Sequence, residues 1–195
     1  MQKRSLETRT RIMNAALECF SRAGYAATGV IEICEAAGVS KGAFYHHFPS
    51  KQSIFLALLH DWLQSIDAQL EASRQGALST TQALRQMSEL MTGVFEQAGG
   101  HLPLFLEFWT QANHDPLIWQ AIIEPYQRYE TYFSLMIKQG IAEGSLKPVD
   151  ADSAARTLVS LALGLLLQGL LDPAGARWEQ VAEQSIQFLL DGISK

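Results

Sequence analysis

The sequence is poor in cysteine, and its two cysteines show no recognisable arrangement for thiol chemistry. Cys19 and Cys34 lie fifteen residues apart, with no CxxC pair and no cluster of cysteine with histidine. This spacing offers neither a disulfide framework nor a zinc site, so we expect no metal and no cofactor. Both thiols are interpreted as small buried apolar groups in a reducing cytoplasm, with a redox switch as the alternative.

The sequence also lacks a long hydrophobic run and a secretory leader. Its first residues, MQKRSLETRTRIM, are basic and polar, and no apolar segment follows them. The longest uncharged run, residues 157–171, is shorter than the roughly 20 residues that a membrane-spanning helix needs. Hydrophobic residues still make up 48% of the chain, which is enough for a packed core. We therefore expect a globular cytoplasmic protein without a membrane partner.

Charge is scarce, at 18% of the residues, and it is unevenly spread. Residues 1–51 contain seven lysines and arginines against four glutamates, a net of +3, whereas residues 52–195 contain eight basic and sixteen acidic residues, a net of −8. A basic N-terminal segment on an acidic body favours an anionic polymer as the partner of that segment. An ordinary solvated surface is the alternative that charge alone leaves open.

Apolar residues recur with helical spacing along nearly the whole chain, and no convincing strand-like alternation appears. Glycine, proline and capping residues divide this pattern into about nine helices. We therefore predict an all-α fold with a trihelical N-terminal domain, residues 1–50, and a helical bundle, residues 51–195. The first three predicted helices end at Gly24, span 30–37 and run from the cap Ser40 to Pro49. The fourth runs from the cap Ser50 to about 70, and two more span 81–97 and 104–113. The seventh spans 116–143, with a cap at Asp115 and a kink at Pro125. The eighth is capped by Asp150 or Asp152 and reaches 171, and the last spans 178–190.

Two short helices in VIEICEAAGVSKGAFYHHF, residues 30–48, have the arrangement of a helix-turn-helix. Gly38 permits the left-handed backbone that a tight turn needs, and Ser40 can cap the second helix. Phe44 and Phe48, four residues apart, are expected to anchor that helix to the domain. Its other side chains are then exposed, as in a helix that enters the major groove of DNA.

The segments RTRIMNAALECFSRAGYAATGV and IEICEAAGVSKGAFYHHFPSK resemble the N-terminal domain of the TetR/AcrR family of transcriptional regulators. The inward apolar residues, the Gly-Val-Ser turn, the Tyr-His-x-Phe helix end and the following Ser-Lys fall in one register. Ala43 and Gly29 depart from the family, because each stands where serine or threonine is common. The resemblance implies that Lys41, Gly42, Ala43 and His46 face base edges, and that Tyr45, His47 and Lys51 contact phosphates with help from Thr28.

The adjacent His46 and His47 could serve DNA contact, a metal site or catalysis. Neighbouring helical residues diverge by about 100°, so this pair cannot chelate one metal as histidines four residues apart can. Catalysis would need an orienting carboxylate and a pocket, and a short convex helix offers neither. We interpret both residues as DNA contacts, with surface histidines of no particular role as the alternative.

For residues 51–195 the resemblance implies a body that binds a small-molecule effector and forms a homodimer. Aromatic residues and methionines are frequent there, which favours a mostly apolar or aromatic effector, although ordinary core packing explains many of them. The segment FLEFWTQANHDP, residues 105–116, also resembles part of the choline-responsive repressor subgroup. The predicted effector-binding residues are Met91, Phe95, Phe105, Phe108, Trp109, Tyr126 and Tyr129.

The helix predicted to end at residue 171 is apolar almost all round, in the stretch LVSLALGLLLQGLL. Such a helix is buried in a core or at an interface. Together with the last helix, from Trp178, it is expected to form a four-helix interface with a second copy of the chain. Gly164 and Gly169 would allow the helices to approach closely.

These features predict a ligand-responsive transcriptional regulator, a repressor that binds a palindromic operator as a homodimer and is released by a small molecule. The long helix from residue 51 is expected to transmit the signal, as the only element in contact with both sites. The alternative is an architectural DNA-binding dimer without a ligand, against which the acidic body argues. An enzyme is not expected, because the sequence has no HExxH, no Gly-rich phosphate loop and no carboxylate pair on one helix face.

Overall fold

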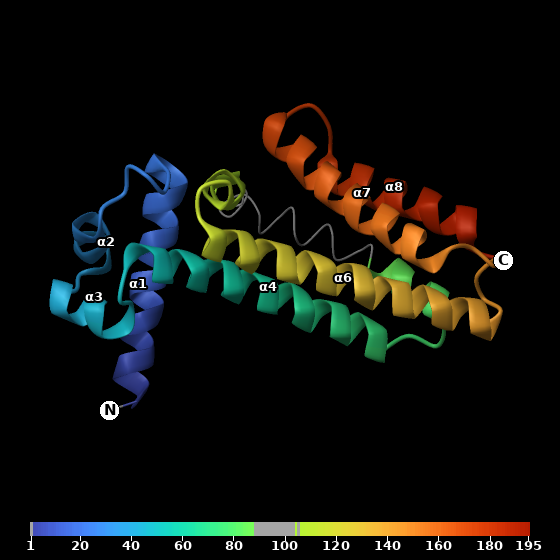
Figure 1. Ribbon diagram of the computed structural model, residues 1–195, viewed down its shortest axis with the longest axis horizontal. Coiled ribbons are helices and arrows are strands. Elements are labelled where there is room, and N and C mark those ends of the chain that lie inside the picture. The colour runs from blue at the N-terminus through green and yellow to red at the C-terminus, as the bar shows by residue number, and fades with distance from the viewer. Residues whose placement is uncertain (1, 88–103, 105) are drawn as a thin grey trace. The chain divides into compact units, whose positions relative to one another are not determined.

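The computed structural model describes residues 2–87, 104 and 106–195 (Figure 1). Regular structure in these residues is helical, and the pairing of extended chain is limited to one isolated bridge between Leu146 and Ser194. The all-α prediction is therefore confirmed. The helices are α1 (Gln2–Ala23), α2 (Val30–Ala37), α3 (Lys41–His47), α4 (Lys51–Gln75), α6 (Pro116–Glu143), α7 (Ala151–Leu171) and α8 (Trp178–Ile193), with further helical segments at 80–87 and 106–112.

The chain forms two compact units, and two helices belong to both. The first unit contains Met1–Gln64 and Gly100–Ala121, and the second contains Ser65–Gly99 and Ile122–Lys195. Both α4 and α6 begin in the first unit and end in the second. The first turns of α4 and α6 therefore pack within the first unit.

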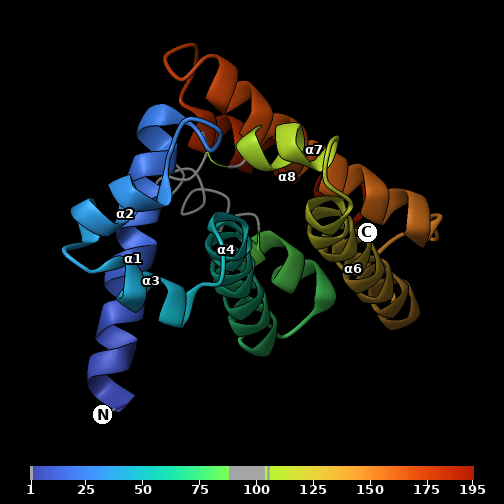
Figure 2. The same ribbon diagram turned by 60° about the vertical axis from the view of Figure 1, so that its left-hand side comes forward.

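Helix α1 and the first turns of α4 belong to the first unit (Figure 2), and both contribute rings to an aromatic core. The Phe55 ring lies 4.3 Å from the Tyr25 ring and 4.0 Å from the Phe108 ring, measured between centroids. Phe20 meets Phe55 edge-on at 5.6 Å. Aromatic pairs in such tilted and edge-on arrangements contribute about 0.5–1.5 kcal/mol beyond burial. This cluster attaches the first turns of α4 to α1.

The second unit is built on α7 and α8, which lie side by side, together with α6 and the 80–87 segment (Figure 1). A Cβ at Gly140 on α6 would come within 2.6 Å of the Leu146 side chain, so glycine is needed where the following chain returns over the helix. The buried core residues of this unit are Ala83, Leu84, Met87, Met136, Ile137, Leu146, Ala151, Ala155, Leu158, Ile186 and Leu190.

Three helices begin at the capping residues that the sequence predicted. Ser50 Oγ accepts the Ser53 N–H at 3.0 Å at the start of α4. Asp115 Oδ1 accepts an N–H of the first turn of α6 at 2.8 Å, and Asp150 Oδ1 accepts the Ser153 N–H at 2.7 Å at the start of α7. These side chains bind amide groups that the first turn of a helix leaves without an intrahelical partner.

Among the described helices, α7 is long and apolar enough to cross a membrane by length and composition. The core helix of a soluble protein passes the same test, and one face of α7, including Leu158 and Leu165, is buried in the second unit. On another face Leu167 and Leu171 are 41% and 71% exposed. The helix is thus apolar on a buried side and on an exposed side.

Candidate DNA-binding surface and effector-binding body

The turn between α2 and α3 is closed by a glycine in the left-handed conformation. Gly38 has φ 62° and ψ 42°. Its N–H donates to the Glu35 carbonyl at 3.1 Å, and the Val39 N–H donates to the Cys34 carbonyl at 3.0 Å, the Schellman pattern of a helix end. A residue with a Cβ would be strained at this φ. The left-handed turn predicted at Gly38 is confirmed.

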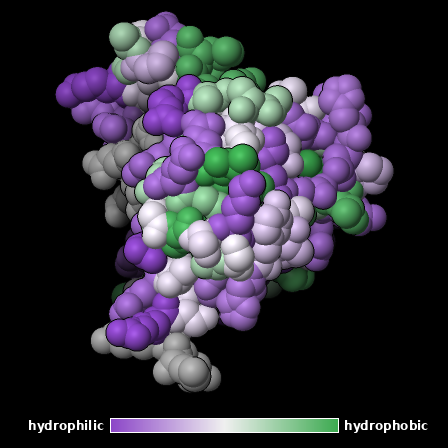
Figure 3. Space-filling model, turned by 90° about the vertical axis from the view of Figure 1, so that its left-hand side faces the viewer, coloured by the Kyte–Doolittle hydropathy of each residue, from purple (hydrophilic) through white to green (hydrophobic). Residues whose placement is uncertain are grey.

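Helix α3 is held by its cap and by two buried rings. Ser40 Oγ accepts the Ala43 N–H at 3.1 Å, as predicted for an N-cap. Phe44 and Phe48 are 0% and 3% exposed, so they anchor the helix to the domain. Seen from the side on which α2 and α3 lie, the surface is mainly hydrophilic (Figure 3). The residues that α3 presents to solvent are Lys41, Gly42, Tyr45 and His46.

Gly42 has no packing reason to be a glycine. A Cβ there would meet nothing closer than Ser40 Oγ, at 3.8 Å, which is an ordinary contact. A glycine inside a helix costs about 1 kcal/mol relative to alanine. The missing side chain leaves the backbone of α3 open to close approach by another molecule.

Thr28 and Lys51, two residues expected at phosphates, are engaged inside the first unit. Thr28 is 1% exposed, and its hydroxyl donates to the Gly24 carbonyl at 2.8 Å. The Lys51 ammonium donates to the carbonyls of Tyr25 and Thr28, at 2.7 and 2.9 Å. Burial lowers the pKa of Lys51, and Glu107 acts in the opposite direction. Thr28 thus has a role in the fold, because its hydroxyl is buried, and Lys51 could reach a phosphate only by leaving these carbonyls.

The cysteines and histidines of the domain differ in environment. Burial raises the pKa of both Cys19 and Cys34, which keeps them as neutral thiols. The His46 and His47 rings are 5.0 Å apart between centroids, and burial, His46 and Arg9 lower the pKa of His47. In the part of the chain that the structure describes, no group of three or more His, Cys, Asp or Glu could hold a metal ion.

The predicted effector-binding residues are divided between the two units. Phe108 is 2% exposed in the aromatic core of the first unit, whereas Trp109 is 50% exposed. Tyr126 and Tyr129 lie on α6 in the second unit. The others, Met91, Phe95 and Phe105, lie outside the described residues.

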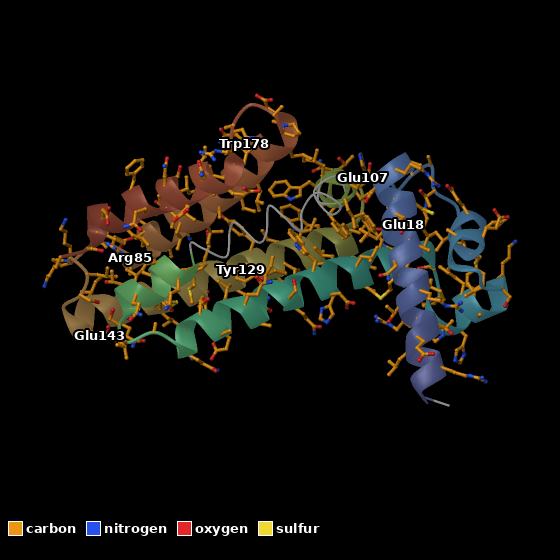
Figure 4. All side chains as sticks on the ribbon, turned by 180° about the vertical axis from the view of Figure 1, so that it is seen from behind. Glu18, Arg85, Glu107, Tyr129, Glu143 and Trp178 are labelled. Atoms are coloured by element: carbon orange, nitrogen blue, oxygen red, sulfur yellow. The ribbon has the colours of Figure 1, made fainter. Side chains whose placement is uncertain are left out.

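Tyr129, labelled in Figure 4, borders a hollow of about 260 Å³ in the second unit. Its hydroxyl donates to Asp67 at 2.9 Å, and Arg128 binds both oxygens of the same carboxylate, at 2.7 and 3.2 Å. Burial and the Asp67 carboxylate raise the pKa of Tyr129, which keeps it a neutral donor. The buried hydroxyl of Tyr132 has no hydrogen-bond partner among the described residues. The hollow is lined by Asp67, Leu70, Glu71, Arg128, Tyr129 and Tyr132.

Two family models account for most of the chain. Residues 12–58 match the model of bacterial regulatory proteins of the tetR family, and residues 80–193 match the C-terminal model of BetI-type transcriptional repressors. The chain belongs to the TetR family. The resemblance of its N-terminal sequence to that family is thereby confirmed, and its helix-turn-helix is the DNA-binding element of a transcriptional regulator.

Relatives that span nearly the full length are also transcriptional regulators. UidR of Escherichia coli K12 is 26% identical over 194 residues, which cover 99% of this chain and 96% of UidR. BetI of Ectopseudomonas mendocina is 26% identical over 184 residues, which cover 93% of this chain and 91% of BetI. A transcriptional regulator from Saccharomonospora viridis, solved in complex with choline, shares the fold with a TM-score of 0.85 at 24% identity, covering 97% of this chain and 98% of that one.

Helix α4, predicted as the only element in contact with both the DNA-reading site and the effector site, is not the only helix that runs from the first unit into the second. α6 also begins in the first unit, where Ile118 is 2% exposed, and it continues into the second. The cap at Asp115 was readable from the sequence, because capping involves only neighbouring residues. The packing of the first turns of α6 in the first unit was not readable, because it depends on contacts between segments far apart in the chain.

Proposed function

We propose that this TetR-family protein is a ligand-responsive repressor that binds a palindromic operator as a homodimer and leaves it when a small molecule binds. The exposed face of α3 supports this proposal most directly. Lys41 and His46 carry donors that suit base edges, and the 52% exposed Tyr45 suits a phosphate. The methyl group of Ala43 suits a thymine methyl group. Such a protein acts on DNA in the cytoplasm.

The exposed apolar side chains of α7 and α8 support a homodimer. Leu171 is 71% exposed and Phe188 is 74% exposed, and water contact at such side chains is unfavourable. In an isologous dimer, a second copy of the chain covers the exposed apolar side chains of α7 and α8 together. Two α3 helices related in this way must lie about 34 Å apart to reach successive major grooves, which explains why a palindromic operator is expected.

The hollow beside Tyr129 supports an effector site in the body. Tyr129 and Tyr132 offer ring surface to an apolar effector, and the unpartnered hydroxyl of Tyr132 offers one hydrogen bond. We expect a small, mostly apolar molecule. Choline, which the Saccharomonospora viridis regulator binds, belongs in the first screen because aromatic rings attract quaternary ammonium groups.

Control of operator affinity follows from the helices that the two units share. An effector that binds one arrangement of the dimer more tightly shifts the population toward that arrangement. A coupling of about 1–3 kcal/mol is enough for a usable switch. Both α4 and α6 carry the change, because both run from one unit into the other.

The test starts with selection of an operator from a random duplex library, followed by a compound screen. We expect a palindromic operator and at least one compound that raises the melting temperature and releases the protein from it. If no compound changes either quantity, the ligand-free architectural dimer replaces this proposal. With an active compound, Trp109→Ala tests whether this half-exposed residue contacts the effector, because loss of such a contact costs induction.

A further inference from the structure

Arg9 on α1 lies beside the C-terminal end of α3. Its guanidinium carbon is 5.4 Å from the centroid of the Phe48 ring, and its side chain is partly buried. No carboxylate among the described residues forms an ion pair with Arg9. In contrast, Arg22 on the same helix binds Glu32 at 2.8 Å. Within the described part of the chain, Arg9 thus lies against a ring and has no acidic partner.

Arg9 belongs to a cluster of like charges with the two histidines of α3. Arg9 and His47 both lie beside the Phe48 ring, at 5.4 and 6.5 Å from its centroid, and the His46 ring is 5.0 Å from the His47 ring. Besides burial, both His46 and Arg9 lower the pKa of His47. The groups facing His47 are His46 from its own helix and Arg9 from α1, and neither is acidic. In the free protein this arrangement disfavours the charged form of His47, and an anion from outside would compensate the repulsion.

The cluster lies at the C-terminal end of α3, where an anion must be bound by side chains and not by the helix backbone. The C-terminal end of a helix presents carbonyl groups with partial negative charge, which repel a phosphate. A phosphate beside the end of α3 must therefore be bound by cationic side chains. Arg9 offers two parallel N–H groups in the geometry that phosphate oxygens favour.

We propose that Arg9 binds a DNA phosphate next to His47 at the C-terminal end of α3, and that His47 takes up a proton when DNA binds. The free ring nitrogen of the neutral imidazole accepts a proton from solvent, and no other bond is formed or broken. The resulting imidazolium donates to the same phosphate group or to its neighbour along the strand. The family resemblance assigned a phosphate to His47 alone, with no role for Arg9 and no proton.

The direction of the pH effect follows from the two states of His47. In the free protein its pKa lies below the ordinary histidine value, so the neutral form is favoured. A nearby phosphate raises the pKa on DNA, because it favours the charged form. DNA affinity therefore increases as the pH falls from the raised value of the complex towards the lowered value of the free protein.

The first experiment measures binding to a labelled duplex of arbitrary sequence, about 30 base pairs long, over a range of salt concentrations. Binding without sequence specificity reports phosphate contacts, with a slope of about 0.9 per contact in log affinity against log salt. We expect Arg9→Gln to reduce the slope by about one contact and Arg9→Lys to retain it. Arg11→Gln is the matched control, because it removes the same charge from the same helix about 200° around its axis. Equal slopes in Arg9→Gln and Arg11→Gln overturn the proposal for Arg9.

The second experiment uses the wild-type protein, so it does not depend on a variant that folds. Calorimetry of DNA binding in two buffers of different ionisation enthalpy counts the protons taken up, and we expect an uptake that His47→Gln abolishes and His46→Gln retains. Zero uptake by the wild type overturns the protonation of His47. Proton uptake that persists in His47→Gln also overturns it, because the proton then binds to another group.

Discussion

The side-chain amide of Gln52, in the first turn of α4, donates a hydrogen bond to Asp115 Oδ2 at 2.6 Å. The other oxygen of Asp115 accepts the Leu117 N–H at 2.8 Å and thereby caps α6. One carboxylate thus fixes the beginnings of the two helices that continue into the second unit. In the second unit Asp67 of α4 binds Arg128 of α6, so the two helices are bonded to each other in both units. A change that moves one of these helices must act on the other.

The bond between Gln52 and Asp115 is testable with a double-mutant cycle. Gln52→Ala removes one donor to a carboxylate, and Asp115→Asn keeps the cap while it weakens that bond. We expect the two effects on the free energy of unfolding in urea to be non-additive by about 0.5–3 kcal/mol. Gln64→Ala, at an exposed position on the same helix, is the control and should be additive with Asp115→Asn. Additive effects for Gln52 would show that the bond contributes nothing.

Gly42 should combine a gain in stability with a loss of function. Gly42→Ala restores an ordinary helical residue where space is open, so we expect the free energy of unfolding to rise by about 0.5–1 kcal/mol. We expect operator affinity to fall, because the new methyl group stands where DNA approaches the backbone. Gly192→Ala, which also meets nothing within 4 Å, should leave operator affinity unchanged. Unchanged affinity in Gly42→Ala would remove Gly42 from the DNA-binding surface.

Tyr45 and Lys51 should differ in their effect on stability. Tyr45 is exposed and contacts mainly the Phe44 ring, so Tyr45→Ala should weaken binding to all DNA sequences, flatten the salt dependence and leave the melting temperature nearly unchanged. Lys51→Ala leaves the carbonyls of Tyr25 and Thr28 without their donor, so it should lower the melting temperature as well. Thermal unfolding and DNA titration of both variants check this. A stable Lys51→Ala with a flattened salt dependence would restore Lys51 as a phosphate contact.

The dimer interface is best tested at the exposed apolar residues. Leu171→Asp and Phe188→Asp place charges on faces that a partner copy would bury, and burial of an unpaired charge is strongly unfavourable. We expect both variants to sediment as folded monomers at micromolar concentration. The same change at Leu166 is unsuitable, because this residue is 6% exposed and belongs to the core of its own chain.

Leu78→Asp provides the control for the dimer test. Leu78 is 95% exposed and precedes the 80–87 segment, away from α7 and α8 in the chain. The variant should retain the oligomeric state of the wild type. A wild-type protein that sediments at 21.6 kDa would contradict the proposed homodimer.

The sequence by itself determined the features whose cause is local. These features are the left-handed turn at Gly38, the caps at Ser40, Ser50 and Asp150, and the inward rings of Phe44 and Phe48. Each of them depends on residues only a few positions apart in the chain. Helical periodicity then determined the fold class, because the spacing of apolar residues repeats in every helix. The order and spacing of residues in the helix-turn-helix also identified the family, and the family implied a function in transcription.

Only the tertiary structure decided which side chains meet across the chain. Lys51 binds the carbonyl of Tyr25, 26 residues away, and Gln52 binds Asp115, 63 residues away. Arg9 and Phe48 meet because α1 packs beside α3, and neither helix carries a sequence signal for the other. Such contacts follow from how helices pack, which depends on the shape of all the buried side chains together. The contacts that join α1, α3, α4 and the start of α6 within the first unit were therefore the ones that the sequence could not assign.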